Sequence, residues 1–142
     1  MKIVISPSKY FSIFLCLFLF IPIAEAVTKT GTINADETWS GIIETTGNVT
    51  IAEGVTVTVD PGTIIKMGAA DRISVDGTFI AVGTVGSKIN FTSILDDRLG
   101  GDTNGDGGAT TPAAGDWSRI ENVTGNTANT SLEQVVIKYG GN

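Results

Sequence analysis

The sequence predicts an all-β fold built as a short solenoid, in which brief strands step round tight corners and stack on one another. Apolar and polar residues alternate along Val55, Thr56, Val57, Thr58 and Val59, which is typical of a half-buried strand. Turn signals that combine glycine with an acidic residue or proline separate such runs. No window shows a helical stripe, and the 18 glycines disfavour helices.

A weak internal repeat favours stacked coils. The stretches VTIAEGVTV (49–57), VTVDPGTII (57–65) and ISVDGTFIA (73–81) each join two short aliphatic strands through an acidic or glycine-containing turn. An antiparallel β-sandwich would also produce the alternation, but it explains the offset copies less well. The side chains expected to face inward are Val57, Val59, Ile73, Val75, Ile89 and Phe91.

The first 26 residues have the pattern of a secretory signal peptide. Lys2 and Lys9 precede an apolar run at 11–23, and Ala24 and Ala26 are small residues at the positions that a signal peptidase reads. The run is short for a membrane anchor, which needs about 20 residues. The sequence therefore predicts cleavage after Ala26 and a secreted, extracellular or cell-surface protein with no membrane span after cleavage.

Composition limits the kinds of site that the chain can form. A net charge of −6 over 142 residues disfavours nucleic acid and anionic membranes as partners. Histidine, the commonest general base and transition-metal ligand, does not occur. The single cysteine, Cys16, lies in the expected signal peptide, so the mature domain depends on its core, on a metal ion or on further chain.

Five motifs follow one another between residue 49 and the end of the chain. They are the corner at Asp60, Pro61 and Gly62, the strands at 77–84 and 89–93, the acidic loop at 102–107 and the GDW element at 115–117. In this order they resemble the N-terminal portion of bacterial secreted right-handed parallel β-helix proteins of the pectin-lyase-like superfamily. The resemblance implies right-handed parallel β-helix coils over 49–142, in a superfamily that hosts lyases, hydrolases, adhesins and surface stalks.

The two ends of the expected β-helix differ. Residues 27–48, which contain Trp39, are expected to lie across the first coil as an N-terminal cap. The chain ends at VVIKYGGN, where a further coil is expected. We expect truncation at this end. A naturally short helix and end-to-end self-association through the exposed terminal coil are the alternatives.

The acidic, glycine-rich loop at 96–116 contains the clearest candidate site. Asp102, Asn104 and Asp106 fit the D-x-[DN]-x-[DN]-G pattern of calcium loops. Oxygen side chains at alternate positions converge when the backbone curls, and calcium takes six to eight oxygen ligands. An EF-hand is excluded, because Ala113 occupies the twelfth position and no flanking helices are expected.

Two further carboxylates are candidates to complete this site, because both flank the base of the loop. Asp116 lies downstream of the motif and Asp97 lies upstream. The sequence thus predicts one Ca²⁺ ion held by Asp102, Asn104, Asp106 and Asp116, with Asp97 as an additional ligand. A metal-free turn is the alternative, because Asp, Asn and Gly also favour turns.

For function, the sequence predicts a structural or binding domain that forms the N-terminal part of a larger surface protein, with a carbohydrate or another cell-surface ligand as its partner. The alternative is the remnant of a carbohydrate-active lyase or hydrolase, for which Asp96 with Asp97, and Arg98 or Arg119, are candidates. No catalytic residue is predicted, since so few coils form no substrate groove. An ice-binding solenoid is less favoured, because only Thr56 and Thr58 form a Thr-x-Thr pair.

Overall fold

The computed structural model describes residues 25–123 and 128–141, and its secondary structure is entirely β. All pairings between the named strands are parallel. The described residues contain no helix that could cross a membrane, while residues 1–24 of the expected signal peptide lie outside them. The strands are β1 (Val27–Ile33), β2 (Glu37–Trp39), β3 (Ile42–Ile51), β4 (Thr56–Val59), β5 (Ile64–Met67), β6 (Ile73–Val75), β7 (Thr78–Val82), β8 (Ile89–Ser93), β9 (Ile120–Asn122), β10 (Asn129–Glu133) and β11 (Val135–Ile137).

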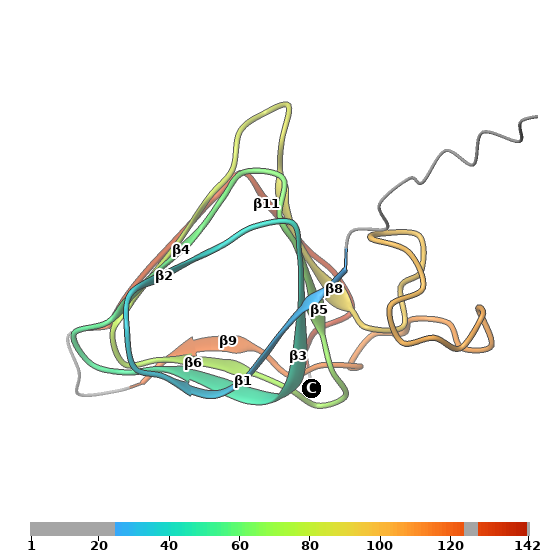
Figure 1. The fold of residues 1–142 in the computed structure, drawn as a ribbon, viewed down its shortest axis with the longest axis horizontal. Coiled ribbons are helices and arrows are strands. Elements are labelled where there is room, and N and C mark those ends of the chain that lie inside the picture. The colour runs from blue at the N-terminus through green and yellow to red at the C-terminus, as the bar shows by residue number, and fades with distance from the viewer. Residues whose placement is uncertain (1–24, 124–127, 142) are drawn as a thin grey trace, which may run out of the picture.

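The strands line three sides of a triangle when the molecule is viewed along the stack (Figure 1). The first side is the sheet β2-β4-β7-β10. The second side joins the first half of β3 to β5, β8 and β11, and the third joins its second half to β6 and β9. β3 passes from one side to the next around Gly47, whose φ of 135° is accessible to glycine.

The chain visits these sides in rotation, so that each circuit lies on the preceding one. Val57 pairs with Phe79 and Val49 pairs with Ile73, so a circuit takes 22 residues on the first side and 24 on the third. The repeat copies 49–57 and 73–81 occupy equivalent places, whereas 57–65 begins on another side. This parallel arrangement excludes the antiparallel sandwich.

The core is a set of inward-facing columns along the stack. All six side chains predicted to face inward are buried. Phe79 lies between Trp39 and Phe91, with ring centroids 5.7 and 6.3 Å away in edge-to-face arrangements. Such aromatic pairs add about 0.5–1.5 kcal/mol to the free energy gained by burying their area.

A buried carboxylate stabilises the corner between the second and third sides. Asp71 Oδ2 accepts hydrogen bonds from Thr45 Oγ1 at 2.6 Å and from the Gly47 N–H at 2.9 Å. Thr45 Oγ1 in turn accepts from the Gly68 N–H at 2.9 Å. These bonds satisfy polar groups of two successive circuits and join them at the corner.

Residues 27–48, for which the sequence predicts a cap, form β1, β2 and the first half of β3 as members of the same sheets. Side chains close this end of the stack: Lys29 Nζ lies 2.9 Å from Glu37 Oε2 and 5.8 Å from the centroid of the Trp39 ring. Burial raises the pKa of Glu37, but hydrogen bonds from Trp39 and Lys29 outweigh it and leave this pKa below its ordinary value.

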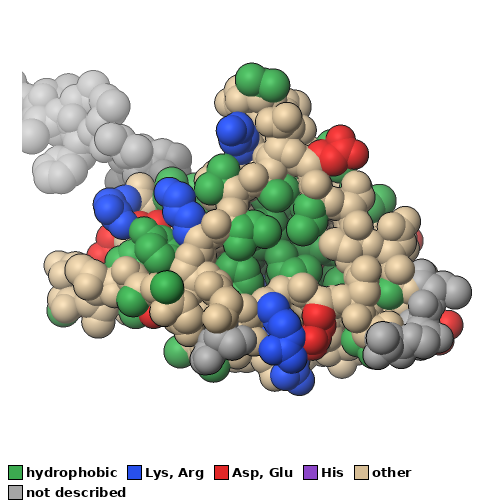
Figure 2. Space-filling view, turned by 180° about the vertical axis from the view of Figure 1, so that it is seen from behind, with side chains coloured by type: hydrophobic (Ala, Val, Ile, Leu, Met, Phe, Trp, Pro, Cys, Tyr) green, Lys and Arg blue, Asp and Glu red, His purple; other side chains and the backbone are tan. Residues whose placement is uncertain are grey.

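The opposite end of the stack is apolar. β9, β10 and β11 are the last strands of their sides, and Figure 2 shows hydrophobic side chains in the hollow centre of this face. Trp117, Ile120, Leu132 and Ile137 line a cavity of about 360 Å³ there. End-to-end self-association through this surface stays a prediction.

Replacing Phe79 tests the aromatic column. Phe79→Ala should lower the free energy of unfolding by about 3–5 kcal/mol, because it removes a fully buried ring that contacts two others. The matched control is Ile80→Ala, which truncates the half-buried neighbour on the outer face of β7 and should cost about 1 kcal/mol or less. Denaturant unfolding measures both, and equal losses would contradict the proposed inward and outward assignment.

Candidate metal centre

The acidic loop covers the outer face of the second side. It follows β8, projects beyond the triangle in Figure 1 and returns at Trp117. Glu44, Lys66 and Thr92 lie side by side in register on β3, β5 and β8. Each is buried, although their inward-facing neighbours form the core. The loop provides this cover, and Lys66 Nζ donates a hydrogen bond to the Gly101 carbonyl.

The aspartate motif forms a tightly curled turn. Asp102 Oδ1 accepts from the Asp106 N–H at 3.0 Å, and its Oδ2 accepts from the Gly107 N–H at 2.8 Å. Asp106 Oδ1 then accepts from the Gly108 N–H at 2.7 Å. Gly107 and Gly108 have φ values of 66° and 81°, a region that glycine enters without a steric penalty.

Hydrogen bonding also sets the charge state of Asp106. The hydroxyl of Thr110 and the backbone N–H groups of Gly108 and Ala109 hold the pKa of this carboxyl below its ordinary value. Asp106 therefore stays ionised at neutral and mildly acidic pH.

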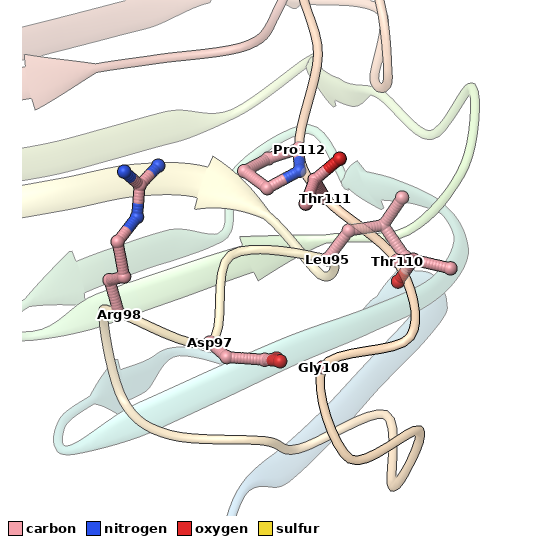
Figure 3. A pocket seen from close by; sticks show the side chains of 7 residues that line it. All are labelled: Leu95, Asp97, Arg98, Gly108, Thr110, Thr111 and Pro112. Atoms are coloured by element: carbon pink, nitrogen blue, oxygen red, sulfur yellow. The ribbon is translucent and has the colours of Figure 1, made fainter.

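Three carboxylates converge where the loop meets its own base. One oxygen atom from each of Asp97, Asp102 and Asp106 lies within 4.8 Å of the others. Asp97 Oδ1 is buried without a hydrogen-bond partner, and Figure 3 shows its carboxylate directed toward Gly108. Buried carboxylate oxygens are normally paired with a donor or a cation. A cation at this point would satisfy the Asp97 oxygen.

Positive side chains balance only part of this charge. Burial lowers the pKa of Lys66, while the negative charges of Asp97 and Glu44 oppose that effect. Arg98 Nε lies 3.3 Å from Asp96 Oδ1. Carboxylates outnumber cationic side chains around the loop, so the local charge is negative: Lys66 and Arg98 are positive, and Glu44, Asp96, Asp97, Asp102, Asp106 and Asp116 are negative.

The other predicted ligands have different places. Asn104 lies beside the group, where its Nδ2 donates to Asp106 Oδ2 at 3.0 Å. The structure does not bring Asp116 into the three-carboxylate group. Its Oδ2 accepts from the Ala113 N–H at 2.9 Å and stabilises the turn that leads back to Trp117.

Sequence reasoning missed three residues that the loop buries beside the three carboxylates, outside the group itself. Glu44 and Lys66 occupy outward positions of strands, where polar residues ordinarily contact solvent, and no sequence signal shows that a loop covers them. Thr103 occupies a variable position of the motif, yet its Oγ1 is buried without a hydrogen-bond partner. It is a neutral oxygen whose residue directly follows Asp102, one of the converging carboxylates, in the chain.

The donor set fits a hard cation. Carboxylate, hydroxyl and carbonyl oxygens are the ligands that Ca²⁺ and Mg²⁺ take, and calcium accepts the irregular geometry that a loop provides. Asp97, Asp102 and Asp106 would supply three charged oxygens. The two arginines considered for catalysis are paired with other groups: Arg98 donates to Asp96 and Tyr139, and Arg119 donates to Glu121.

A second feature of the loop is an open cavity of about 380 Å³ beside the carboxylates. Asp97, Arg98 and Pro112 are among the residues that line it (Figure 3).

Comparisons with known proteins give no family for the chain: no protein-family model matches it, and no curated protein or solved structure shows significant similarity.

Removing the Lys66 ammonium tests its role as a resident counter-ion. Lys66→Met should lower the free energy of unfolding by about 3 kcal/mol, because it removes a buried positive charge that offsets the negative charges of Asp97 and Glu44, and with it the hydrogen bond to the Gly101 carbonyl. The loop should also become more sensitive to limited proteolysis between residues 98 and 116. Lys88→Met, at an exposed position, is the control, and a variant of Lys66 with unchanged proteolysis would contradict this role.

Proposed function

We propose that the chain is a secreted or cell-surface structural and binding domain, built as a short right-handed parallel β-helix and stabilised by calcium. The stacked parallel circuits support the solenoid, and the ordered motifs support the likeness to the pectin-lyase-like superfamily. A rigid stack with one cation-stabilised loop is suited to presenting a surface to a carbohydrate or another cell-surface ligand.

The convergence of Asp97, Asp102 and Asp106 carries this proposal. Three carboxylates with oxygens within 4.8 Å repel one another, and the repulsion is stronger where Asp97 Oδ1 is shielded from water. A divalent cation removes the repulsion and ties the base of the loop to its tip. Extracellular calcium modules bind with dissociation constants of about 10⁻⁴ to 10⁻³ M, which suits a stabilising ion.

Calcium titration tests the site. At a free calcium concentration of ten times Kd, the folded protein should gain about 1.4 kcal/mol of stability, seen as heat in calorimetry and as a higher Tm than in chelator. Asp97→Asn should abolish this gain, because it neutralises the ligand whose oxygen has no other partner.

Two further variants sharpen the titration. Asp60→Asn, at an exposed corner, is the matched control and should bind as the parent does. Asp116→Asn distinguishes the ligand set: unchanged affinity would leave Asp116 as a turn residue only, and a loss would make it a ligand. Absence of both heat and a Tm change in the parent protein would overturn the calcium proposal.

Secretion has its own test. When the full chain is expressed in a bacterial host, the exported protein should begin at Val27, because Ala24 and Ala26 are the small residues that a signal peptidase reads. N-terminal sequencing and intact mass measure the new terminus. Ala24→Arg should block processing, whereas Thr28→Arg, beyond the cleavage point, should be processed. Export with residues 1–26 still attached would contradict the proposal.

A further inference from the structure

A second cavity lies where the start of β1 meets the acidic loop. It has a volume of about 360 Å³, and its walls are Glu25 and Ala26, Glu44 of β3, and loop residues 100–103. In Figure 1 the blue start of β1 lies beside the orange loop. The cavity therefore brings together the residues that precede β1 and the covered face of the second side.

Glu44 is the unusual member of this cavity. The residue is only 9% exposed, and its Oε1 is buried without a hydrogen-bond partner. Lys66, its neighbour on β5, donates instead to the Gly101 carbonyl. A second buried oxygen without a partner, Thr103 Oγ1, belongs to the same walls. Acceptors of this kind require a donor, and a cationic donor suits a carboxylate best.

The strand register places the start of β1 near this cavity. Thr28 pairs with Glu44, and Val27 pairs with Ile43, so the Ala26–Val27 peptide bond lies just before the position that faces Ile43. Ala26 itself lines the cavity, and the Val27 nitrogen is bonded to the Ala26 carbonyl carbon, about 1.33 Å away.

We propose that cleavage of the Ala26–Val27 bond creates an α-ammonium group on Val27 that enters this cavity and pairs with Glu44. The inference rests on the proposed secretion and cleavage after Ala26. Hydrolysis by a host peptidase adds water across the amide: Ala26 leaves with a carboxylate, and Val27 keeps the nitrogen as an amine. With an ordinary pKa of about 7.7–8.0, an α-amine is mostly protonated at neutral pH.

The electrostatic change favours this pairing. Cleavage removes the Glu25 carboxylate from the cavity wall and adds a positive charge where Glu44 and Asp102 supply negative ones. The ammonium has three N–H donors, and Glu44 Oε1 and Thr103 Oγ1 are acceptors without another partner. The new terminus thereby fastens β1 to the loop in the mature protein only.

The test uses the secreted protein with its natural terminus. Selective transamination converts the Val27 α-amine into a neutral ketone and leaves lysine side chains intact. In the parent protein, Tm should fall by about 4–8 °C, the shift that losing a single stabilising ion pair typically produces in a small domain. In Glu44→Gln the same treatment should change Tm little, because the partner charge is already absent.

Controls separate this proposal from the others. Glu53→Gln, at an exposed turn, should behave as the parent does. If Glu44→Gln does not fold, the acylation rate of the Val27 amine is measured in the parent protein. A rate below that of an amine in an unstructured peptide supports the pairing without the variant. Equal Tm values before and after transamination overturn the ion pair, as does loss of calcium binding in Glu44→Gln, which would make Glu44 a metal ligand. A secreted protein that does not begin at Val27 shows instead that the proposed cleavage is wrong.

Discussion

The parallel register between β3, β5 and β8 is the constraint on which the rest of the structure depends. It stacks Ile43, Ile65 and Phe91 into the core, and because side chains alternate along each strand it places Glu44 and Lys66 together on the outer face. A shift of one residue would exchange the two sets and expose the apolar column. The same hydrogen-bond ladder therefore decides both the core and the floor of the candidate site.

The loop is a second layer whose stability is electrostatic. It contains many glycines and few large apolar residues, so it buries little hydrophobic area of its own. Its hydrogen bonds are polar in origin. Lys66 donates to the Gly101 carbonyl, and the carboxylates of Asp102 and Asp106 accept from backbone N–H groups within the turn. Both proposals concern this layer, because polar attachments are the kind that an added charge, from a cation or from a new chain terminus, would strengthen.

Sequence periodicity correctly predicted the strands near 56–59, 73–75, 78–82 and 89–93 and their buried side chains, because a period of two follows directly from strand geometry. Residues 27–48, where a cap is expected, contribute β1, β2 and part of β3 to the sheets, and β1 is a largely exposed outer strand. The motif spacing indicated Asp102 and Asp106, and Asp97 joins them. Asp116, though close in the chain, bonds within its own turn.

The sequence by itself determined the strand-forming segments, the corners between them and the curled aspartate turn, because each depends on neighbours within a few residues. Only the tertiary structure decided what the loop covers. Glu44 and Lys66 are unremarkable in pattern, and they join Asp97 in a charged, largely buried group only when successive circuits stack and the loop folds back over them. Burial is a property of this packing, and it changes ordinary outward-facing side chains into groups that need a partner.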